Sequence, residues 1–317
     1  MEIRRLIRNA FLFSLGFLIL SAALQWLYEK KVIDHAREAN LAAALLAHTE
    51  IDYLFLGDSH PMKAVDTALV PGSFLFASTG ENYTFNRLRL QHVLEAGIHP
   101  KAVVIPLDLH CFGRARRAYI ADDAYWVRQP AYLALGEEKG QYYSYLRRYV
   151  RAHTLAYAGQ FRRIAYAMYP ALPKYLELTG GKWALLDSNG IGFMARALAE
   201  DGRETADLHF GDGQTYPDAE LEAEFQRLLK LCKAQDIAVR LVRYPVTAPY
   251  LSRAAELIGP EFIQPLETFV FGGDSIPVFD AMQRYVDQPA YFLDAHHLNP
   301  SGRATFSKAL QIWLQKR

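Results

Sequence analysis

Short apolar runs alternate with longer helical patterns along much of the chain. Four runs are almost wholly apolar, namely residues 51–56, 73–77, 102–107 and 237–242. Runs of this length are typical of strands that are buried on both faces, and strands that alternate with helices indicate right-handed βαβ units. The pattern predicts an α/β fold with a parallel sheet of about five strands. Residues 276–279 or 290–293 would supply the fifth strand.

The alternation fails between about residues 112 and 215, which predicts an inserted helical or irregular segment. The insertion begins rich in Arg and Tyr, a composition that suits an anionic glycan or lipid headgroups. Amphipathic helices that pack their Tyr rings and leave Arg in water would show the same composition, so both interpretations stay open. Residues 182–190 look like a strand followed by a polar turn.

The first 31 residues have a pattern of their own. Residues 10–27 are almost continuously apolar, close to the ~20 residues that a helix needs to cross a bilayer. Basic residues flank the run unequally: Arg4, Arg5 and Arg8 precede it, and Lys30 and Lys31 follow it. The positive-inside bias predicts a single-pass anchor in the cell (inner) membrane with a cytoplasmic amino terminus, and an extracytoplasmic or periplasmic domain over residues 32–317. A cleavable signal peptide, cut near Ser21-Ala22-Ala23, is the alternative.

Composition narrows the function classes only slightly. The 317 residues carry a net charge of +1, which gives no electrostatic argument for nucleic acid. Neither zinc-type cysteine spacing nor a Walker-type loop is present, and no cofactor is expected. Cys111 and Cys232 would pair in an oxidising compartment or stay buried as free thiols, and burial is the commoner fate.

Candidate chemistry starts at the end of the first predicted strand. Gly57-Asp58-Ser59 follows that strand directly, and Gly57 permits a backbone conformation that a side chain would resist. Ser59 would then emerge at the carboxyl edge of the sheet, where open α/β sheets place their ligands. This is a position for a nucleophile. A turn whose Ser or Asp simply caps the next helix is the alternative.

A base and an acid occur near the carboxyl terminus. Asp294 and His297 precede Asn299-Pro300, a favourable start for a last helix, and should reach the same sheet edge as Ser59. A carboxylate that orients an imidazole, which in turn takes a serine proton, forms a hydrolytic triad. A metal site made by Asp294, His296 and His297 is disfavoured, because adjacent histidines seldom both point at one ion.

These two motifs resemble the first and last blocks of the SGNH (GDSL-type) hydrolase superfamily over roughly residues 50–110 and 235–315. The resemblance implies a flavodoxin-like three-layer α/β/α sandwich. It also implies Ser59 as the nucleophile, His297 as the general base and Asp294 as its orienting acid.

The chain departs from that family in the residues expected to stabilise an oxyanion. Gly80 fits the family's glycine after the second strand, but residues 107–110 replace the Gly-x-Asn-Asp block. Asn82 is the predicted substitute donor, and Asp58 and His60 complete the predicted substrate-binding set. Loss of one oxyanion donor can cost about 10²–10³ in rate, so this gap bears on activity.

The anchor together with Gly-Asp-Ser-His and residues 78–83 resembles one subgroup more specifically. It includes the D-alanyl transfer protein of teichoic acid synthesis and alginate-type O-acetyltransferases, which commonly work beside a membrane-bound O-acyltransferase. The resemblance implies a membrane-anchored serine O-acyltransferase or esterase that acts on an envelope polysaccharide. A non-catalytic envelope scaffold or glycan-binding protein, and a plain exported esterase or lipase, are the alternatives.

Overall fold

The computed structural model describes residues 2–34, 37–48, 50–117, 124–158, 191–211 and 215–316. The chain divides into two compact units, one of residues 1–44 and 121–188 and the other of residues 45–120 and 189–317. The strand and turn predicted at residues 182–190 lie outside the described residues.

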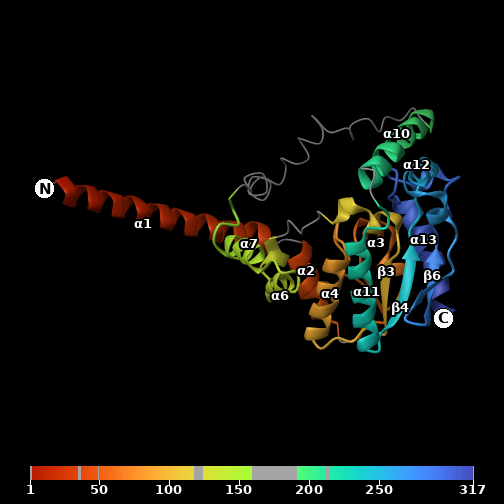
Figure 1. Cartoon of the computed structure of the whole chain (residues 1–317), viewed down its shortest axis with the longest axis horizontal. Coiled ribbons are helices and arrows are strands. Elements are labelled where there is room, and N and C mark those ends of the chain that lie inside the picture. The colour runs from red at the N-terminus through yellow and green to blue at the C-terminus, as the bar shows by residue number, and fades with distance from the viewer. Residues whose placement is uncertain are drawn as a thin grey trace. The chain divides into compact units, whose positions relative to one another are not determined.

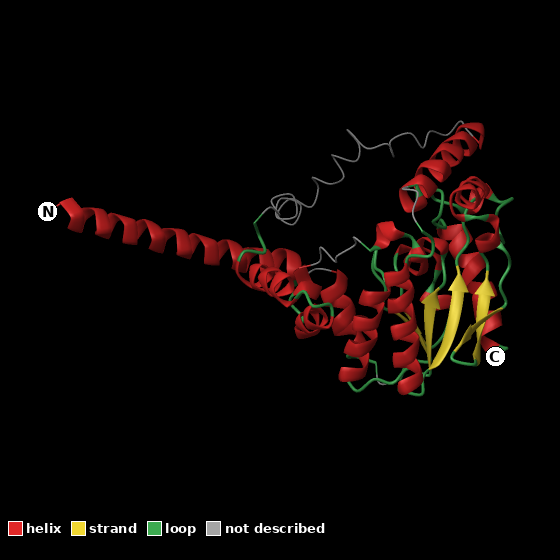
Figure 2. Ribbon diagram, viewed as in Figure 1, coloured by secondary structure: helices red, strands yellow, loops and turns green. Residues whose placement is uncertain are grey.

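The second unit is an α/β unit built on a mostly parallel sheet (Figure 2). The strands are β1 (Tyr53–Phe55), β2 (Ser73–Leu75), β3 (Ala102–Pro106), β4 (Ala238–Arg243), β5 (Thr268–Phe271) and β6 (Asp274–Asp280). Within the described residues they form one six-stranded sheet in the order β2-β1-β3-β4-β6-β5. All neighbours pair in parallel except β5, which is antiparallel to β6. The prediction of a parallel α/β sheet is therefore confirmed, with one edge strand added.

The fifth parallel strand is β6, which contains residues 276–279. The other candidate, residues 290–293, is not a strand, because Pro289–Tyr291 forms a 3₁₀ turn, η7. Sequence analysis missed β5 altogether. It is joined to β6 by Gly272 and Gly273, whose φ angles of 57° and 87° suit a two-residue hairpin turn.

Helices surround this sheet, and Figure 1 shows α4 and α11 beside each other. They are α3 (Ser59–Ala64), α4 (Tyr83–Glu95), α10 (Ile191–Phe210), α11 (Ala219–Ala234), α12 (Ala248–Ile258) and α13 (Pro300–Gln315). Besides η7, the described residues between them include the 3₁₀ turns η2 (Thr67–Leu69), η3 (Leu109–Phe112), η4 (Arg114–Arg116) and η6 (Pro260–Ile263). One core cluster joins the sheet to α3 and α13 through Phe55, Val104, Val242, Ala64 and Phe306. Packing of α13 thus brings the end of the chain to the first strands.

The start of α13 agrees with the sequence analysis. The Asn299 side chain accepts hydrogen bonds from the Ser301 and Gly302 backbone amides, and Pro300 occupies the first turn. This cap fixes where the preceding loop ends. Cys111 and Cys232 are both free and buried, as the burial interpretation predicted.

The first unit is helical in its described part. It contains α1 (Glu2–Tyr28), η1 (Glu29–Ile33), α5 (Ala124–Val127), α6 (Pro130–Glu138), α7 (Tyr142–Thr154) and most of α2 (Arg37–Leu45). The stretch Glu2–Ile33 is long and apolar enough to cross a membrane, and little of it is buried. This is what a membrane anchor requires by length and composition.

Contacts inside the first unit explain a polar interruption in the apolar run. The carboxamide of Gln25 donates to the Ala152 carbonyl (3.4 Å) and accepts from the Ala156 amide (2.8 Å), so the end of α1 is fastened to the end of α7. Among the aromatic residues of the insertion, Tyr132 and Tyr145 pack with ring centroids 4.6 Å apart. That pair fits the packed-helix interpretation of the segment.

Candidate active site

The turn after β1 places Ser59 at the carboxyl edge of the sheet. Gly57 has φ of 132°, and a Cβ at this position would lie 2.8 Å from Pro61 Cγ and 2.9 Å from Pro106 Cγ. Only glycine fits there without a clash. Asp58 is the N-cap of α3 and accepts from the His60 amide (2.9 Å), so Ser59 becomes the first residue of the helix.

The loop before α13 is organised by one carboxylate. Oδ1 of Asp294 accepts from the backbone amides of His296 (3.1 Å) and His297 (2.8 Å). Oδ2 of Asp294 lies 2.8 Å from Nδ1 of His297. The Leu293 amide also donates to the His297 carbonyl (2.8 Å), which closes the loop on itself. The loop therefore sets the position of the His297 ring from its own residues.

Ser59, His297 and Asp294 are brought together as the sequence analysis expected. Nε2 of His297 lies 2.8 Å from Oγ of Ser59. Ser59 is buried, whereas the side chains of His297 and Asp294 keep 15% and 19% of their surface exposed. Burial by itself would raise the pKa of Asp294, but the hydrogen bond from His297 and its charge outweigh burial and lower that pKa to about 2.

The ionised Asp294 carboxylate determines which proton transfers are available. It accepts from Nδ1–H of His297, and this leaves the lone pair on Nε2 facing the serine hydroxyl. The imidazole can then take the Ser59 proton as the oxygen attacks an acyl carbonyl. The arrangement is competent for acyl transfer or ester hydrolysis.

A second imidazole–carboxylate pair lies beside the first. Nδ1 of His60 is 2.8 Å from Oδ2 of Asp108, and Oδ1 of Asp108 accepts from the Tyr244 amide (2.6 Å). The two side chains are only 0% and 5% exposed. Burial raises the pKa of Asp108 to about 7 and lowers the pKa of His60 to about 3. The His60 ring lies 5.5 Å from the His297 ring, centroid to centroid.

Asp58 links the turn that carries Ser59 to His110 and Arg116. Its Oδ2 accepts from Nε2 of His110 (2.6 Å) and pairs with Nη2 of Arg116 (3.0 Å), and its side chain has no exposed surface. Burial would raise the pKa of Asp58, but the charges of His110 and Arg116 hold it well below its usual range. Asp58 is thus an ionised group with partners of its own, directly before Ser59 in the chain.

Helix α10 contributes residues that sequence analysis did not find. Oδ2 of Asp201 accepts from the Ala295 amide (2.7 Å) within the Asp294–His297 loop. His209 bonds the Tyr250 hydroxyl through Nδ1 (2.9 Å), and its ring stacks on His110 with centroids 5.1 Å apart. These residues fall in the segment assigned to the insertion, where no strand pattern pointed to the site.

The structure gives Asn82 a capping role. It is the N-cap of α4, and its oxygen accepts from the Thr84 and Phe85 amides at 3.1 and 3.4 Å. Its Nδ2 donates to the Arg116 carbonyl (3.0 Å). Gly80 has a left-handed φ of 79°. A role of Gly80 and Asn82 in holding an oxyanion stays a prediction.

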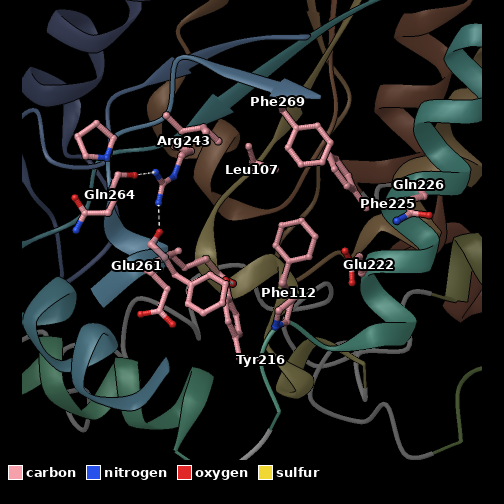
Figure 3. A pocket seen from close by; sticks show the side chains of 15 residues that line it. Leu107, Phe112, Tyr216, Glu222, Phe225, Gln226, Arg243, Glu261, Gln264 and Phe269 are labelled. Carbon is pink, nitrogen blue, oxygen red and sulfur yellow. Dashed lines mark hydrogen bonds between the residues drawn. The ribbon is translucent and has the colours of Figure 1, made fainter. Parts of the chain in front are cut away.

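An apolar cavity of about 310 Å³ lies elsewhere in the second unit (Figure 3). Its walls are mainly apolar and include the aromatic residues Phe112, Phe225, Phe269 and Tyr216. Arg243 is the cation on its wall, but it is already committed to Asp280 (2.9 Å) and to the Gln264 and Phe262 carbonyls. None of the three triad residues lines this cavity.

Ligating side chains gather in three groups within the described parts of the chain. The groups are His60, His296 and His297; Asp58, His60 and His110; and Asp108, His110 and Cys111. In the second group, Asp58 and His110 already bond each other. The metal alternative considered from the sequence, which used Asp294 with the two adjacent histidines, is not one of these groups.

Together, the fold and the site define an α/β protein with a Ser-His-Asp arrangement where β1 and the last helix of the chain meet. In comparisons with known proteins, no family model matches the chain, and no curated protein matches it.

Proposed function

We propose that this protein is a membrane-anchored, extracytoplasmic serine O-acyltransferase or esterase that acts on a cell-envelope polysaccharide. The observation that carries the proposal is the continuous contact from Ser59 Oγ through His297 to Asp294, with both links at 2.8 Å. The parallel strand order β2-β1-β3-β4-β6 supports a flavodoxin-like three-layer sandwich, the fold that the SGNH resemblance implies.

In the proposed reaction, Ser59 Oγ attacks the acyl carbonyl of an ester while His297 Nε2 takes the hydroxyl proton. The tetrahedral intermediate collapses, the alkoxide leaves with the proton from His297, and the acyl group stays on Ser59. A sugar hydroxyl or water then attacks the acyl-enzyme while His297 takes its proton, the bond between Ser59 Oγ and the acyl carbon breaks, and His297 returns the proton to Oγ. Transfer and hydrolysis differ only in which acceptor reaches the site.

The amino-terminal helix supports the proposed place of action. The Glu2–Ile33 stretch would anchor the chain in the membrane, and the three arginines before the apolar run favour a cytoplasmic amino terminus. The α/β unit would then face the envelope side, where polysaccharide is acylated. A membrane-bound O-acyltransferase is the proposed partner, and it would deliver acyl groups across the membrane.

Labelling with a fluorophosphonate tests the nucleophile. The probe should modify the full chain in detergent, Ser59→Ala should stay unlabelled, and Ser275→Ala, at an exposed position on β6, should label like the parent. In cells, Ser59→Ala should lower the acyl content of the envelope polysaccharide. Equal labelling of the parent and Ser59→Ala would overturn the assignment.

One observation favours a second candidate, a non-catalytic envelope scaffold. The Asn82 carboxamide is used to cap α4 and to bond Arg116, and the Gly-x-Asn-Asp block is missing, so side-chain oxyanion donors are scarce. A folded parent protein that resists the probe yet binds envelope polysaccharide would support the scaffold. Fast hydrolysis of simple acyl esters without polymer would instead indicate a plain exported esterase.

A further inference from the structure

We infer that His60, His296 and His297 form a binding site for a divalent transition cation of the Zn²⁺ type, directly beside Ser59. One ring nitrogen from each histidine lies within 4.8 Å of the others. His60 comes from α3 and the other two come from the loop before α13, so packing of α13 against α3 creates the group. Imidazole nitrogens are ligands that suit zinc, copper and nickel rather than magnesium or calcium.

His60 carries the strongest sign of a ligand. Its side chain has no exposed surface, and Nε2 has no hydrogen-bond partner among the described residues. Nδ1 is taken by Asp108, which leaves Nε2 as the ring nitrogen that is available to a cation. A carboxylate behind a histidine is the usual outer-shell support of a metal ligand, because it fixes both the tautomer and the ring orientation. A buried ring nitrogen without a partner is otherwise rare in folded proteins.

His297 has the same support from a second carboxylate. Asp294 holds its Nδ1, and its Nε2 points at Ser59 Oγ. Nδ1 of His296 is also buried and has no hydrogen-bond partner in the described structure. Its distance to Asp294 Oδ1 is 3.6 Å, which is too long for a hydrogen bond. All three rings therefore have a nitrogen that a cation could use.

The sequence objection that adjacent histidines point apart does not hold in this loop. Asp294 Oδ1 binds both backbone amides, and the His296 and His297 ring centroids are only 4.0 Å apart. Zn–N bonds of about 2.0–2.1 Å place tetrahedral ligand atoms about 3.4 Å apart. From separations of at most 4.8 Å, each nitrogen needs to move by less than about 1 Å to close on the ion. Three histidines also leave a fourth position open for water or Ser59 Oγ.

Occupancy has a direct consequence for the triad. Nε2 of His297 cannot coordinate a cation and accept the Ser59 proton at the same time, because both use one lone pair. Zinc would therefore suppress the serine chemistry reversibly. This consequence rests on the proposed function, whereas binding of the cation does not.

Direct binding is measured first. The full chain in detergent, freed of metal with a chelator, is dialysed against Zn²⁺ and its metal content is determined. We expect about one equivalent per chain, and His60→Gln and His296→Gln should each weaken binding at least about tenfold. His296 is partly exposed, so its variant tests the site even if the buried His60→Gln misfolds. His99→Gln, at an exposed position before β3, is the matched control and should bind like the parent.

Fluorophosphonate labelling with and without Zn²⁺ tests the competition. Zinc should slow labelling of the parent, a chelator should restore it, and His296→Gln should require at least about tenfold more zinc for the same effect. Absence of zinc binding, or binding that ignores both His60→Gln and His296→Gln, overturns the site. Zinc bound at the site with undiminished labelling overturns the competition. Zinc bound there by a chain that never labels supports the site and overturns the proposed serine chemistry.

Discussion

Two imidazole–carboxylate pairs lie side by side in this protein and have different surroundings. His297 and Asp294 sit in a loop, keep 15% and 19% of their side-chain surface, and meet Ser59 through Nε2. His60 and Asp108 are almost fully enclosed, and the Nε2 of His60 meets no hydrogen-bond partner in the described structure. The two pairs have the same residue types and the same 2.8 Å distance between ring nitrogen and carboxylate. The first can therefore be suited to proton transfer while the second links α3 to the residues that follow β3.

The carboxylates show why the two pairs differ. Asp294 accepts two backbone amides and the His297 ring, and these interactions keep its pKa at about 2 despite burial. Asp108 accepts one backbone amide and the His60 ring, and its deeper burial prevails and raises its pKa to about 7. An ionised carboxylate can stabilise the imidazolium that forms when the histidine takes a proton. By this criterion the Asp294 pair is the one suited to catalysis.

The largest effect is expected from Asp294→Asn. The asparagine oxygen can still accept the loop amides, but its NH₂ group would face Nδ1 of His297 and force the proton onto Nε2. That tautomer cannot accept the Ser59 proton, so fluorophosphonate labelling should slow by about 10⁴-fold. The free energy of unfolding, from urea titration, should change by only about 1 kcal/mol. Asp274→Asn, in the exposed pair with Lys233, is the control, and a slowing of Asp294→Asn within tenfold of it would contradict this prediction.

Asp108→Ala should affect stability more than chemistry. It leaves two buried donors, the Tyr244 amide and Nδ1 of His60, without an acceptor. Each buried unsatisfied group costs about 1–3 kcal/mol, so the free energy of unfolding should fall by about 4 kcal/mol in urea titration. Asp108→Asn keeps an acceptor for one of the donors and should lose about half as much. Equal losses of unfolding free energy in the two variants would show that the hydrogen bonds of Asp108 to Tyr244 and His60 do not cause the loss.

The Asp294–His297 pair was within reach of the sequence, and the His60–Asp108 pair was not. Gly57-Asp58-Ser59 follows an apolar run, and Asp294 and His297 precede a capped helix, so local patterns place the first motif after a strand and the second just before the last helix. His60 and Asp108 are 48 positions apart and meet only because β1 and β3 are neighbours. No local periodicity signals such a pairing.

The fold shows the same division between local and distant signals. Four apolar runs predicted four of the five parallel strands, but β5 is only four residues long and pairs antiparallel at an edge. Helix α10 was placed with the insertion because nothing in its own sequence shows that Asp201 reaches Ala295, 94 positions away. A Gly-Gly pair at residues 272–273 was the one available sign of the missed hairpin.

Gly57→Ala should strain the His60–Asp108 pair from both of its members. Its Cβ would meet Pro61, next to His60, and Pro106, two residues before Asp108, at 2.8 and 2.9 Å. Overpacking and the unfavourable φ together should lower the free energy of unfolding by about 2–3 kcal/mol. Gly97→Ala is the matched control, because its φ is 77° but nothing lies within 4 Å of a new Cβ. Chemical denaturation of both separates the clash from the backbone strain, and equal losses would refute the clash.

The smallest effect is expected from Asp201, which contacts the loop that holds Asp294 and His297. Its carboxylate accepts the amide of Ala295, the buried residue between Asp294 and His296. Asp201→Ala frees the loop at one point, so fluorophosphonate labelling should slow by up to about tenfold and unfolding free energy should fall by about 1 kcal/mol. Asp201→Asn retains an acceptor oxygen and should restore labelling. Asp207→Ala, on the same helix but paired with Arg253, should leave labelling unchanged. If Asp201→Ala and Asp207→Ala are labelled at the same rate, α10 covers the loop without positioning His297. The position of the His297 ring would then depend on Asp294 alone.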